Sequence, residues 1–283
     1  MRSTFSYPQN FVRYLGTGGA RYCMIRQMRW TGGIWFSYGG LNGVIDPGPG
    51  SLYHICNATP DIEADSVRVI LLTHKHLDHS TDINVLAEAM TEGGFQKQGT
   101  IILPKDAIEA PDPVFLDYCA QKVGKIQKAC DGLITELENG VTVEAVMHVH
   151  HDVDCFGYIL RKKGLRSWGI ISDTRLMSSF AKRYENCDYI SINTTFLERN
   201  PKSEHMSIQD DIDLLKELHP KLVTISHMGV KLINNGPEKL AKTLSTAQTR
   251  VVAGQDGMII NLDNLKIFSP INKKKEIIKY KII

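Results

Sequence analysis

The chain has 283 residues, of which 42% are hydrophobic and 23% are charged, and its 33 basic and 31 acidic side chains give a net charge of +2. This composition excludes an intrinsically disordered chain, and it lacks the strong basic excess that is usual in a dedicated nucleic-acid-binding protein. The charge balance is too even to argue for or against an RNA or phosphodiester substrate.

The chain contains no apolar stretch near the roughly 20 residues that a membrane-spanning helix needs, and its first residues lack the apolar region of a signal peptide. Six cysteines are spread along the sequence without a CxxC pair: Cys23, Cys56, Cys119, Cys130, Cys155 and Cys187. We expect them to be small buried apolar residues rather than a disulfide framework. The expected location is therefore the cytoplasm, with no membrane span.

The first fifty residues are short apolar segments broken by glycine, which indicates strands joined by tight turns. Residues 43–48 predict a strand that ends in an acidic residue, Asp46. The β-branched run at 67–72 predicts a short buried strand. From Ser80 the apolar spacing becomes helical, and Gly93-Gly94 ends the helix.

Strands and helices alternate in the rest of the chain. Strands are predicted at 141–147, 156–161, 168–172, 189–193, 222–226, 251–253 and 258–262. Helices are predicted at about 207–218 and 237–247, the second beginning at Pro237, where a missing N–H costs nothing. No repeat or linker marks a domain boundary. We therefore expect a single domain over residues 1–283. Periodicity alone supports only an α/β or α+β class, and the order of strands and helices suggests layered sheets with outer helices, a four-layer αββα sandwich.

The strongest functional signal is the run His74-Lys75-His76-Leu77-Asp78-His79, which directly follows the predicted buried strand. Four ligand-type side chains in six residues can converge on a small volume. Imidazole and carboxylate are the ligands that suit zinc and neighbouring transition metals. A solvated polar loop is the alternative, but these side chains would be costly to pack after a buried strand without a metal or many partners.

This run resembles the signature of the metallo-β-lactamase superfamily, and the likeness extends over most of the chain. The resemblance implies two metals at the edge of an αββα sandwich. It implies that His74 and His76 bind the first metal, and that Asp78 and His79 bind the second.

The third ligand of the first metal should be a histidine before a later strand, and the sequence offers His148, His150 and His151. The family pattern places this ligand six residues before a pair formed by a glycine and an aromatic residue, here Gly157-Tyr158. The resemblance therefore implies His151 as the ligand. His148 and His150 are then expected near the site or on the surface.

The remaining landmarks follow in the order of the family. Asp173, in Ser172-Asp173-Thr174, resembles the carboxylate that bridges both metals, with a helix N-cap as the alternative interpretation. His227, which follows the predicted strand at 222–226, is implied as a ligand of the second metal. Asp46 resembles the family's Asp-x-Gly element, whose carboxylate orients metal-site groups. An ordinary turn aspartate before a proline is its alternative interpretation.

His205 lies just before a predicted helix, in Glu204-His205-Met206-Ser207. In the phosphodiesterase and tRNA 3′-processing branch of the superfamily, a histidine in a similar context lies near the metals and donates a proton to the leaving group. An exposed histidine before a helix is the alternative. The opening segment 15–21 also resembles ribonuclease Z-like members. Two differences from the tRNA 3′-endonucleases of this branch argue against that activity. No glycine- and proline-rich arm is found, and His227 lies in a His-Met-Gly sequence rather than in that branch's more extended motif.

The resemblance thus implies a hydrolase with two divalent cations, most simply Zn²⁺, with Mn²⁺ or iron as alternatives. A metal-bridging hydroxide is expected to attack a phosphodiester, in RNA, a cyclic nucleotide or a small molecule. Asp78, Asp173 and His205 are the expected catalytic residues, with general acid–base catalysis contributing ~10²–10⁴-fold.

Two other functions stay open. One is a lactonase, thioesterase or glyoxalase II-like hydrolase, and the other is a non-catalytic metal- or nucleic-acid-binding module. A basic pocket would favour phosphate and an apolar pocket would favour an acyl substrate; the residues concerned are Arg21, Arg26 and Arg29 for the first and Trp30, Trp35 and Phe36 for the second. A homodimer is possible in such families, although nothing in the sequence identifies an interface.

Overall fold

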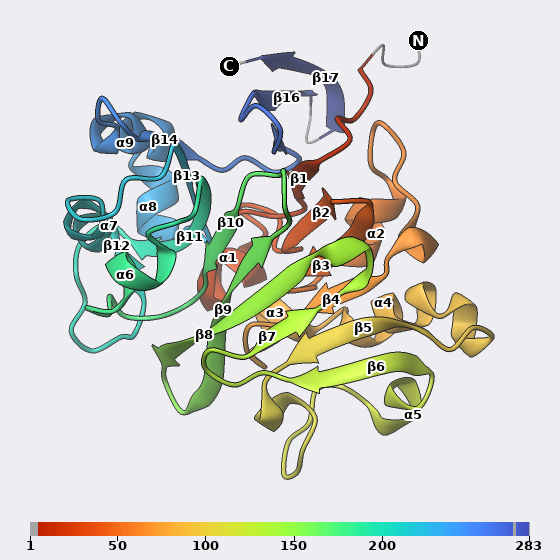
Figure 1. The fold of residues 1–283 in the computed structure, drawn as a ribbon. Helices are drawn as coiled ribbons and strands as arrows, with labels where there is room; N and C mark the ends of the chain where they lie inside the picture. The colour runs from red at the N-terminus through yellow and green to blue at the C-terminus, as the bar shows by residue number, and fades with distance from the viewer. Residues whose placement is uncertain (1–4, 274–275, 283) are drawn as a thin grey trace. The chain divides into compact units, whose positions relative to one another are not determined.

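The computed structural model describes residues 5–273 and 276–282, and the chain divides into two compact units (Figure 1). Unit 1 is drawn from Met1–Thr17, Trp30–Lys128 and Gln255–Ile283, and unit 2 from Gly18–Arg29 and Ala129–Gly254. Each unit consists of one large β-sheet with helices, so the protein is of mixed α/β class with two large sheets. The single domain expected over residues 1–283 stays a prediction.

The sheet of unit 1 has, in the described residues, the strand order β17-β16-β15-β1-β2-β3-β4-β5-β6. Strands β3 to β6 run parallel to one another, and the other neighbours are antiparallel. The strands are β1 (Phe11–Tyr14), β2 (Ile34–Tyr38), β3 (Leu41–Ile45), β4 (Val69–Leu71), β5 (Gln98–Leu103), β6 (Val123–Lys128), β15 (Ile259–Asn261), β16 (Ile267–Lys273) and β17 (Glu276–Ile282).

The helices of unit 1 pack on its sheet through one apolar cluster, except for the short helix Leu77–Ser80, which contributes no residue to that cluster. The helices are α2 (Ser51–Cys56), α3 (Leu77–Ser80), α4 (Ile83–Met90) and α5 (Asp117–Ala120), with short 3₁₀ turns at Ala64–Ser66, Glu92–Gly94 and Lys105–Ala107. Helix α4 buries the predicted stripe of Ile83, Leu86 and Met90 in the same cluster as Ile70 and Leu72 beside it. Burying each such side chain contributes about 1.5–3 kcal/mol, which fixes β4 and the loop that follows it.

The sheet of unit 2 has the order β14-β13-β11-β10-β9-β8-β7 among the described strands, and β12 pairs with β11. Strands β10, β11, β13 and β14 are parallel, whereas β7, β8, β9 and β10 pair antiparallel in sequence. The strands are β7 (Ile134–Glu136), β8 (Thr142–His150), β9 (Val153–Arg161), β10 (Trp168–Ile171), β11 (Tyr189–Phe196), β12 (Met206–Ser207), β13 (Leu222–Ser226) and β14 (Arg250–Ala253).

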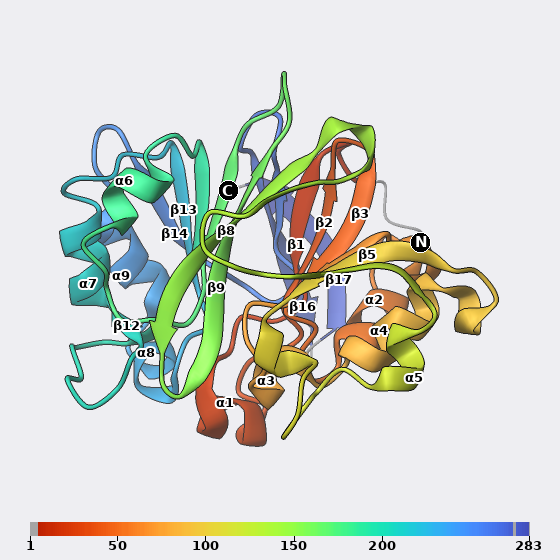
Figure 2. The ribbon, with the colours of Figure 1, turned by 60° about the horizontal axis from the view of Figure 1, so that its bottom comes forward.

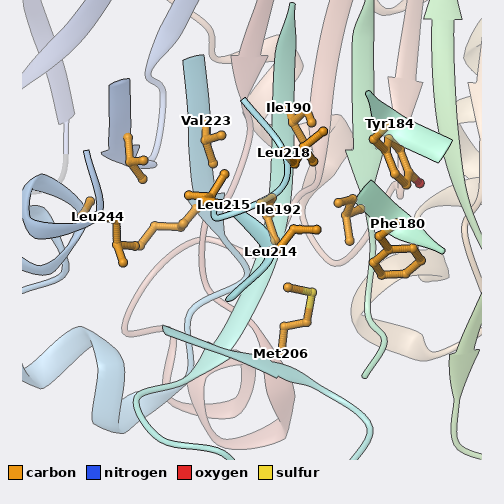
Figure 3. Close-up of a cluster of buried hydrophobic side chains, with 14 of the residues drawn as sticks. Phe180, Tyr184, Ile190, Ile192, Met206, Leu214, Leu215, Leu218, Val223 and Leu244 are labelled. Carbon is orange, nitrogen blue, oxygen red and sulfur yellow. The ribbon is translucent and has the colours of Figure 1, made fainter. Parts of the chain in front are cut away.

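Helices α6 to α9 gather on one side of the unit 2 sheet (Figure 2). Unit 2 contains α1 (Ala20–Arg26), a 3₁₀ turn (Glu138–Gly140), α6 (Phe180–Tyr184), α7 (Ile208–Leu214), α8 (Val230–Asn234) and α9 (Pro237–Leu244). Figure 3 shows their apolar side chains, such as Phe180 and Leu214, with Ile192 and Val223 of the sheet. Pro237 stands at the first helical position of α9, as the sequence predicts.

The strands predicted between residues 141 and 262 all exist, and β8 and β11 extend three residues further than predicted. The helix predicted at about 207–218 is α7, which is shorter than predicted and ends at Leu214. A segment near the N-terminus differs in kind. The glycine-rich start was expected to hold only strands and turns, but Ala20–Arg26 is a helix. Its residues Arg21, Met24 and Arg26 favour helices, and the glycines lie before it rather than in it. Strands β5 and β6 were not predicted.

Four of the six cysteines are buried as expected, whereas Cys56 and Cys130 are exposed, and all six are free thiols. Among the described residues no helix is both long and apolar enough to cross a membrane.

Candidate metal centre

In unit 1 the candidate ligands follow two neighbouring parallel strands. Asp46 comes directly after β3, and the loop Thr73–His76, which continues into α3 with Asp78 and His79, comes after β4. The register pairs Ile45 with Leu71, so both strands end at the same edge of the sheet. In open α/β sheets the carboxyl ends of parallel strands are where ligands bind.

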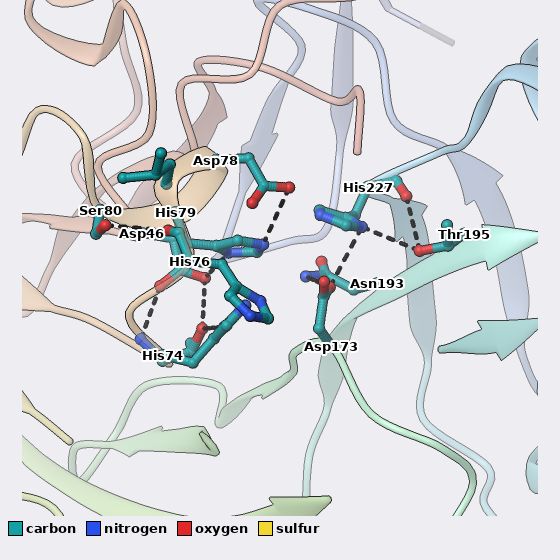
Figure 4. A network of polar contacts seen from close by, with 12 residues as sticks. Asp46, His74, His76, Asp78, His79, Ser80, Asp173, Asn193, Thr195 and His227 are labelled. Carbon is teal, nitrogen blue, oxygen red and sulfur yellow. Dashed lines mark hydrogen bonds and ion pairs between the residues drawn. The ribbon is translucent and has the colours of Figure 1, made fainter. Parts of the chain in front are cut away.

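Asp46 holds this loop through both carboxylate oxygens (Figure 4). Its Oδ1 accepts a hydrogen bond from the Thr73 backbone N–H at 2.7 Å, and its Oδ2 accepts one from the Thr73 hydroxyl at 2.8 Å. Oδ2 also lies 2.9 Å from His79 Nδ1, and the Thr73 hydroxyl lies 3.0 Å from His74 Nδ1. The Thr73 proton goes to Asp46, so His74 donates from Nδ1 to Thr73, and His79 donates from Nδ1 to Asp46. Both imidazoles therefore present Nε2 as the lone-pair nitrogen.

The other two members of the run lie beside these histidines. The ring centroids of His74 and His76 are 4.7 Å apart, those of His74 and His79 are 4.1 Å apart, and Asp78 Oδ2 is 3.8 Å from His79 Nε2. Gly48 makes this packing possible, because a Cβ there would lie 2.0 Å from the backbone oxygen of Asp78. We name Asp46, Thr73, His74, His76, Asp78 and His79 the unit 1 set.

In unit 2 the candidate ligands surround the carboxylate of Asp173, which is 2% exposed and follows β10. Asn193 of β11 donates a hydrogen bond to Asp173 Oδ1 at 2.8 Å (Figure 4). Three ring nitrogens face the same carboxylate: His227 Nδ1 at 3.2 Å, His205 Nδ1 at 3.4 Å and His150 Nε2 at 3.8 Å. The parallel strands β10, β11 and β13 are neighbours, so the residues at their carboxyl ends meet.

Thr195, near the end of β11, was not singled out from the sequence. Its hydroxyl lies 3.0 Å from His227 Nδ1 (Figure 4). The same hydroxyl lies 3.2 Å from His205 Nδ1. Thr195 is 1% exposed, and its backbone oxygen accepts a hydrogen bond from the Gly229 N–H just after His227. The hydroxyl therefore joins the two histidines. We name His150, Asp173, Thr195, His205 and His227 the unit 2 set.

The three neighbouring histidines of β8 and its turn have different environments. His150 is 1% exposed and donates from Nδ1 to the backbone oxygen of Glu204 at 3.0 Å, which leaves Nε2 as the lone-pair nitrogen facing Asp173. Burial lowers the pKa of His150 to about 4, which keeps the ring neutral as a metal ligand requires. His151 lies in the exposed turn with φ +48°, and its backbone N–H bonds the Glu204 carboxylate. Within unit 2 the ring that presents a lone pair to Asp173 is that of His150.

His148 is a core residue rather than a surface or site residue. It is 4% exposed, and its Nε2 donates to the Tyr184 hydroxyl at 3.1 Å, which in turn donates to the backbone oxygen of Ile170. Burial lowers the pKa of His148 to about 3, so the ring stays neutral. This histidine therefore stabilises the packing of α6 on the sheet.

His205 is positioned by the short strand and helix that follow it. Met206–Ser207 pairs with β11, and Ser207 is the N-cap of α7, where its side chain and that of Asp210 form a capping box. The His205 side chain is 13% exposed and contacts Thr195 and Asp173 as described above. The sequence pattern His-x-Ser therefore reflects a histidine fixed two residues before a helix N-cap.

These donors fit divalent transition metals. In unit 1, hydrogen bonds hold the Nδ1 protons of His74 and His79, which is the tautomer that ligates through Nε2. In unit 2, two groups have ligand atoms within 4.8 Å of one another, one formed by Asp173, His205 and His227 and the other by His150, His151 and His205. Imidazole and carboxylate donors suit zinc, manganese and iron.

Most of the residues that would line an apolar or a basic substrate pocket are engaged in other contacts. Trp35 and Phe36 are 1% and 0% exposed in the sheet of unit 1, and Trp30 stacks on His54 with ring centroids 4.1 Å apart. Arg29 bonds Glu238 and the backbone oxygen of Gly254. Trp35 and Phe36 therefore do not line the apolar pocket that would have favoured an acyl substrate, and of the three arginines Arg21 and Arg26 are exposed.

Comparison with known proteins places the chain in a family. Residues 42–228, more than half of the chain, match the Beta-lactamase superfamily domain. The protein belongs to the metallo-β-lactamase superfamily, whose members are mostly metal-dependent hydrolases.

Three similar proteins give the range of likeness. The uncharacterized protein MJ1374 of Methanocaldococcus jannaschii is 27% identical over 90% of this chain and 96% of its own length. The metallo-β-lactamase fold protein YhfI from Bacillus subtilis has a TM-score of 0.70 and 18% identity, covering 89% of this chain and 99% of that one. Human tRNase Z, short form, has a TM-score of 0.64 and 16% identity, covering 89% and 99%. The two structures share the fold with this chain.

Proposed function

We propose that the protein is a dinuclear metal-dependent phosphodiesterase. The observation that carries the proposal is the set of hydrogen-bond partners at three imidazole Nδ1 atoms. His74, His79 and His150 each donate from Nδ1, to Thr73, Asp46 and the Glu204 backbone oxygen, so that each presents Nε2 as a ligand atom. The proposed ligands are His74, His76, Asp78, His79, His150, Asp173 and His227.

The assignment to two metals follows the family signature: His74, His76 and His150 for one, Asp78, His79 and His227 for the other, with Asp173 shared. His150 takes the place expected for His151 because only His150 is buried with its lone pair towards Asp173. The bound metals would lower the pKa of water and stabilise charge on the attacked oxygen. Zinc is the simplest choice for this donor set.

The chain's own groups supply orientation and proton transfer. Asp46 fixes the His79 ring and, through Thr73, the His74 ring. Asp78 and Asp173 offer carboxylate oxygens that can hold the proton of the attacking water. His205, between Thr195 and Asp173, offers an imidazole N–H as the proton donor to the leaving group.

Phosphodiester substrates are favoured over acyl substrates for two reasons. A proton donor is most valuable where the leaving group is an alkoxide such as a ribose oxygen, and His205 is in contact with the unit 2 carboxylate. Trp35 and Phe36, which would have lined an acyl pocket, are core residues. The likeness to human tRNase Z agrees with an RNA or small phosphodiester substrate.

The test is turnover of bis(p-nitrophenyl) phosphate by protein loaded separately with zinc and with manganese, together with metal analysis. We expect metal-dependent hydrolysis that is lost in Asp173→Ala. The matched control is Asp65→Ala, an exposed aspartate of unit 1, which should leave the rate unchanged. Hydrolysis of thioesters or lactones without hydrolysis of phosphodiesters would favour the acyl alternative. Protein that binds no metal under any of these conditions would overturn the proposal.

A further inference from the structure

A cavity of about 520 Å³ lies within unit 2, next to the unit 2 set. Its wall comes from three segments: Gly19–Cys23 without Arg21, the run Thr195–Asn200 that ends β11, and Gly229–Lys231 at the start of α8. We name it the α1 cavity. Its volume lies within the roughly 300–1,000 Å³ range of small-molecule sites.

Two residues in the wall of the α1 cavity contact candidate active-site histidines that do not themselves line it. Thr195, part of its wall, contacts His205 and His227 through its hydroxyl. Gly19, another part, lies against the His227 ring, because a Cβ at Gly19 would be 2.2 Å from His227 Nδ1. A group bound in this cavity is therefore separated from His205 and His227 by single residues of the cavity wall.

The lining of the α1 cavity combines aromatic rings with cations. Tyr22 is 69% exposed, and Phe196 packs edge-on against His205 with ring centroids 5.7 Å apart. Lys231 is exposed and has no ion-pair partner in the part of the chain that the structure describes. Arg26 lies 6.0 Å from the centroid of the Tyr22 ring. Aromatic faces stack on nucleobases for about 1–3 kcal/mol per base, and lysine pairs with phosphate.

Arg199 connects this cavity with a second one. It lines the α1 cavity and also a cavity of about 370 Å³ that includes Arg175 and His205. Salt bridges to Asp210 and Asp213 hold its guanidinium. Two cavities therefore flank the segment from Thr195 to His205, with a fixed arginine common to both.

We infer that the α1 cavity binds the nucleoside next to the scissile phosphodiester, with its base on Tyr22 and a phosphate on Lys231. The substrate is then a nucleotidyl phosphodiester, such as a dinucleotide or single-stranded RNA, rather than a phosphodiester without a base. This inference rests on the proposed function for its catalytic part, whereas nucleotide binding tests the cavity by itself.

The experiment compares Tyr22→Ala, Tyr22→Phe and Lys231→Gln in the full-length, metal-loaded protein. Binding of adenosine 5′-monophosphate and of inorganic phosphate is measured by calorimetry. The ratio of kcat/KM for the dinucleotide ApA to that for bis(p-nitrophenyl) phosphate is measured in parallel. Ile25→Ala is the matched control, since Ile25 is 70% exposed on the same helix and does not line the cavity.

We expect Tyr22→Ala to weaken nucleotide binding and to lower the kcat/KM ratio by about tenfold, equivalent to ~1.4 kcal/mol of lost stacking. Tyr22→Phe should keep nucleotide binding and the kcat/KM ratio, and Lys231→Gln should weaken the binding and lower the ratio. Ile25→Ala should change neither the binding nor the ratio. Adenosine 5′-monophosphate that binds no better than phosphate, or that binds equally well to Tyr22→Ala, would overturn the inference even if phosphodiesters are hydrolysed. Nucleotide binding that depends on Tyr22, in protein that hydrolyses no phosphodiester, would instead refute the proposed function and keep the cavity's assignment.

Discussion

The two units present their candidate ligands in different ways. The unit 1 set lies on one loop after one strand, with Asp46 of the neighbouring strand as the anchor. The unit 2 set is gathered from the ends of β8, β10, β11, β12 and β13, with Thr195 and Asp173 as the points of contact. The first arrangement depends on local hydrogen bonds, whereas the second depends on the register of a sheet. Changes to a single side chain should therefore act locally in unit 1 and spread among several ligands in unit 2.

The largest effect should come from the histidine that joins β8 to the unit 2 set. We expect His150→Ala to lose one equivalent of metal and to reduce phosphodiester turnover by about 10²–10³-fold, because its lone pair faces Asp173. His151→Ala should stay within about threefold of the parent protein. Metal analysis and steady-state kinetics of the two variants distinguish His150 from His151 as the ligand. A larger loss of metal and activity in His151→Ala than in His150→Ala would identify His151 as the ligand.

The next effect concerns the anchor of the unit 1 set. Asp46→Asn removes the charged acceptor of the His79 N–H while keeping the shape of the side chain. We expect metal affinity or activity to fall by about 10–100-fold, the usual cost of losing a group that orients a ligand. Competition with a zinc chelator measures the affinity. Unchanged affinity would mean that the loop holds its geometry without this carboxylate.

A smaller effect tests the close contact between α1 and His227. Gly19→Ala places a methyl group on the ring, so we expect activity to fall about tenfold and unfolding free energy to fall by about 1–3 kcal/mol. The neighbouring change Ala20→Gly relieves a positive φ of +61° and should raise stability by up to about 1 kcal/mol. Urea unfolding and kinetics of both variants give the comparison. Full activity in Gly19→Ala would show that the contact does not constrain the histidine.

The smallest effect lies behind the unit 2 set, at Asp211 of α7. Burial raises the pKa of this carboxyl well above its usual range, and Thr194 donates a hydrogen bond to it. The folded state therefore holds a proton that the unfolded state releases above its ordinary pKa. Stability should fall as pH rises from about 4 towards the folded pKa, by at most ~1.4 kcal/mol per pH unit. Asp211→Asn should remove this part of the slope, as urea unfolding at several pH values will reveal. If the pH dependence of the unfolding free energy is the same in Asp211→Asn, another group takes up the proton.

The unit 1 set was accessible from sequence because its members are adjacent in the chain and follow an apolar run. In unit 2, Asp173 and His227 were found because each ends a recognisable strand. The resemblance implied His151, and this stays a prediction; His150 is proposed in its place because β8 extends to His150, which counting back from Gly157 does not take into account. Strand alternation was the available signal: His148 and His150 share a face of β8, and His151 falls in the turn. Thr195 and Asn193 had no local signature, since their role comes only from the pairing of β11 with its neighbours.

The four-layer sandwich was predicted from the resemblance more than from periodicity, and the family match supports that fold. Helix α1 was mistaken for strand because glycines dominate the residues before it. Strand β5 contains Gly99 with φ +78° as its second residue, and this glycine interrupts an otherwise recognisable apolar run. The sequence therefore predicts helices and strands whose apolar residues recur with one clear period. It does not predict those in which turn residues such as glycine interrupt the pattern.

The pairing of β1 with β15 bears on how the chain folds during synthesis. Phe11 lies opposite Asn261, so the central part of the unit 1 sheet is completed only when nearly the whole chain has left the ribosome. Residues 129–254 and the already synthesised α1 segment contain all of unit 2, which can therefore mature earlier. Contacts between such distant residues form slowly and leave strand edges exposed in the meantime. Until β15 has been synthesised, β1 is paired on one side only, with β2, and its other edge stays open.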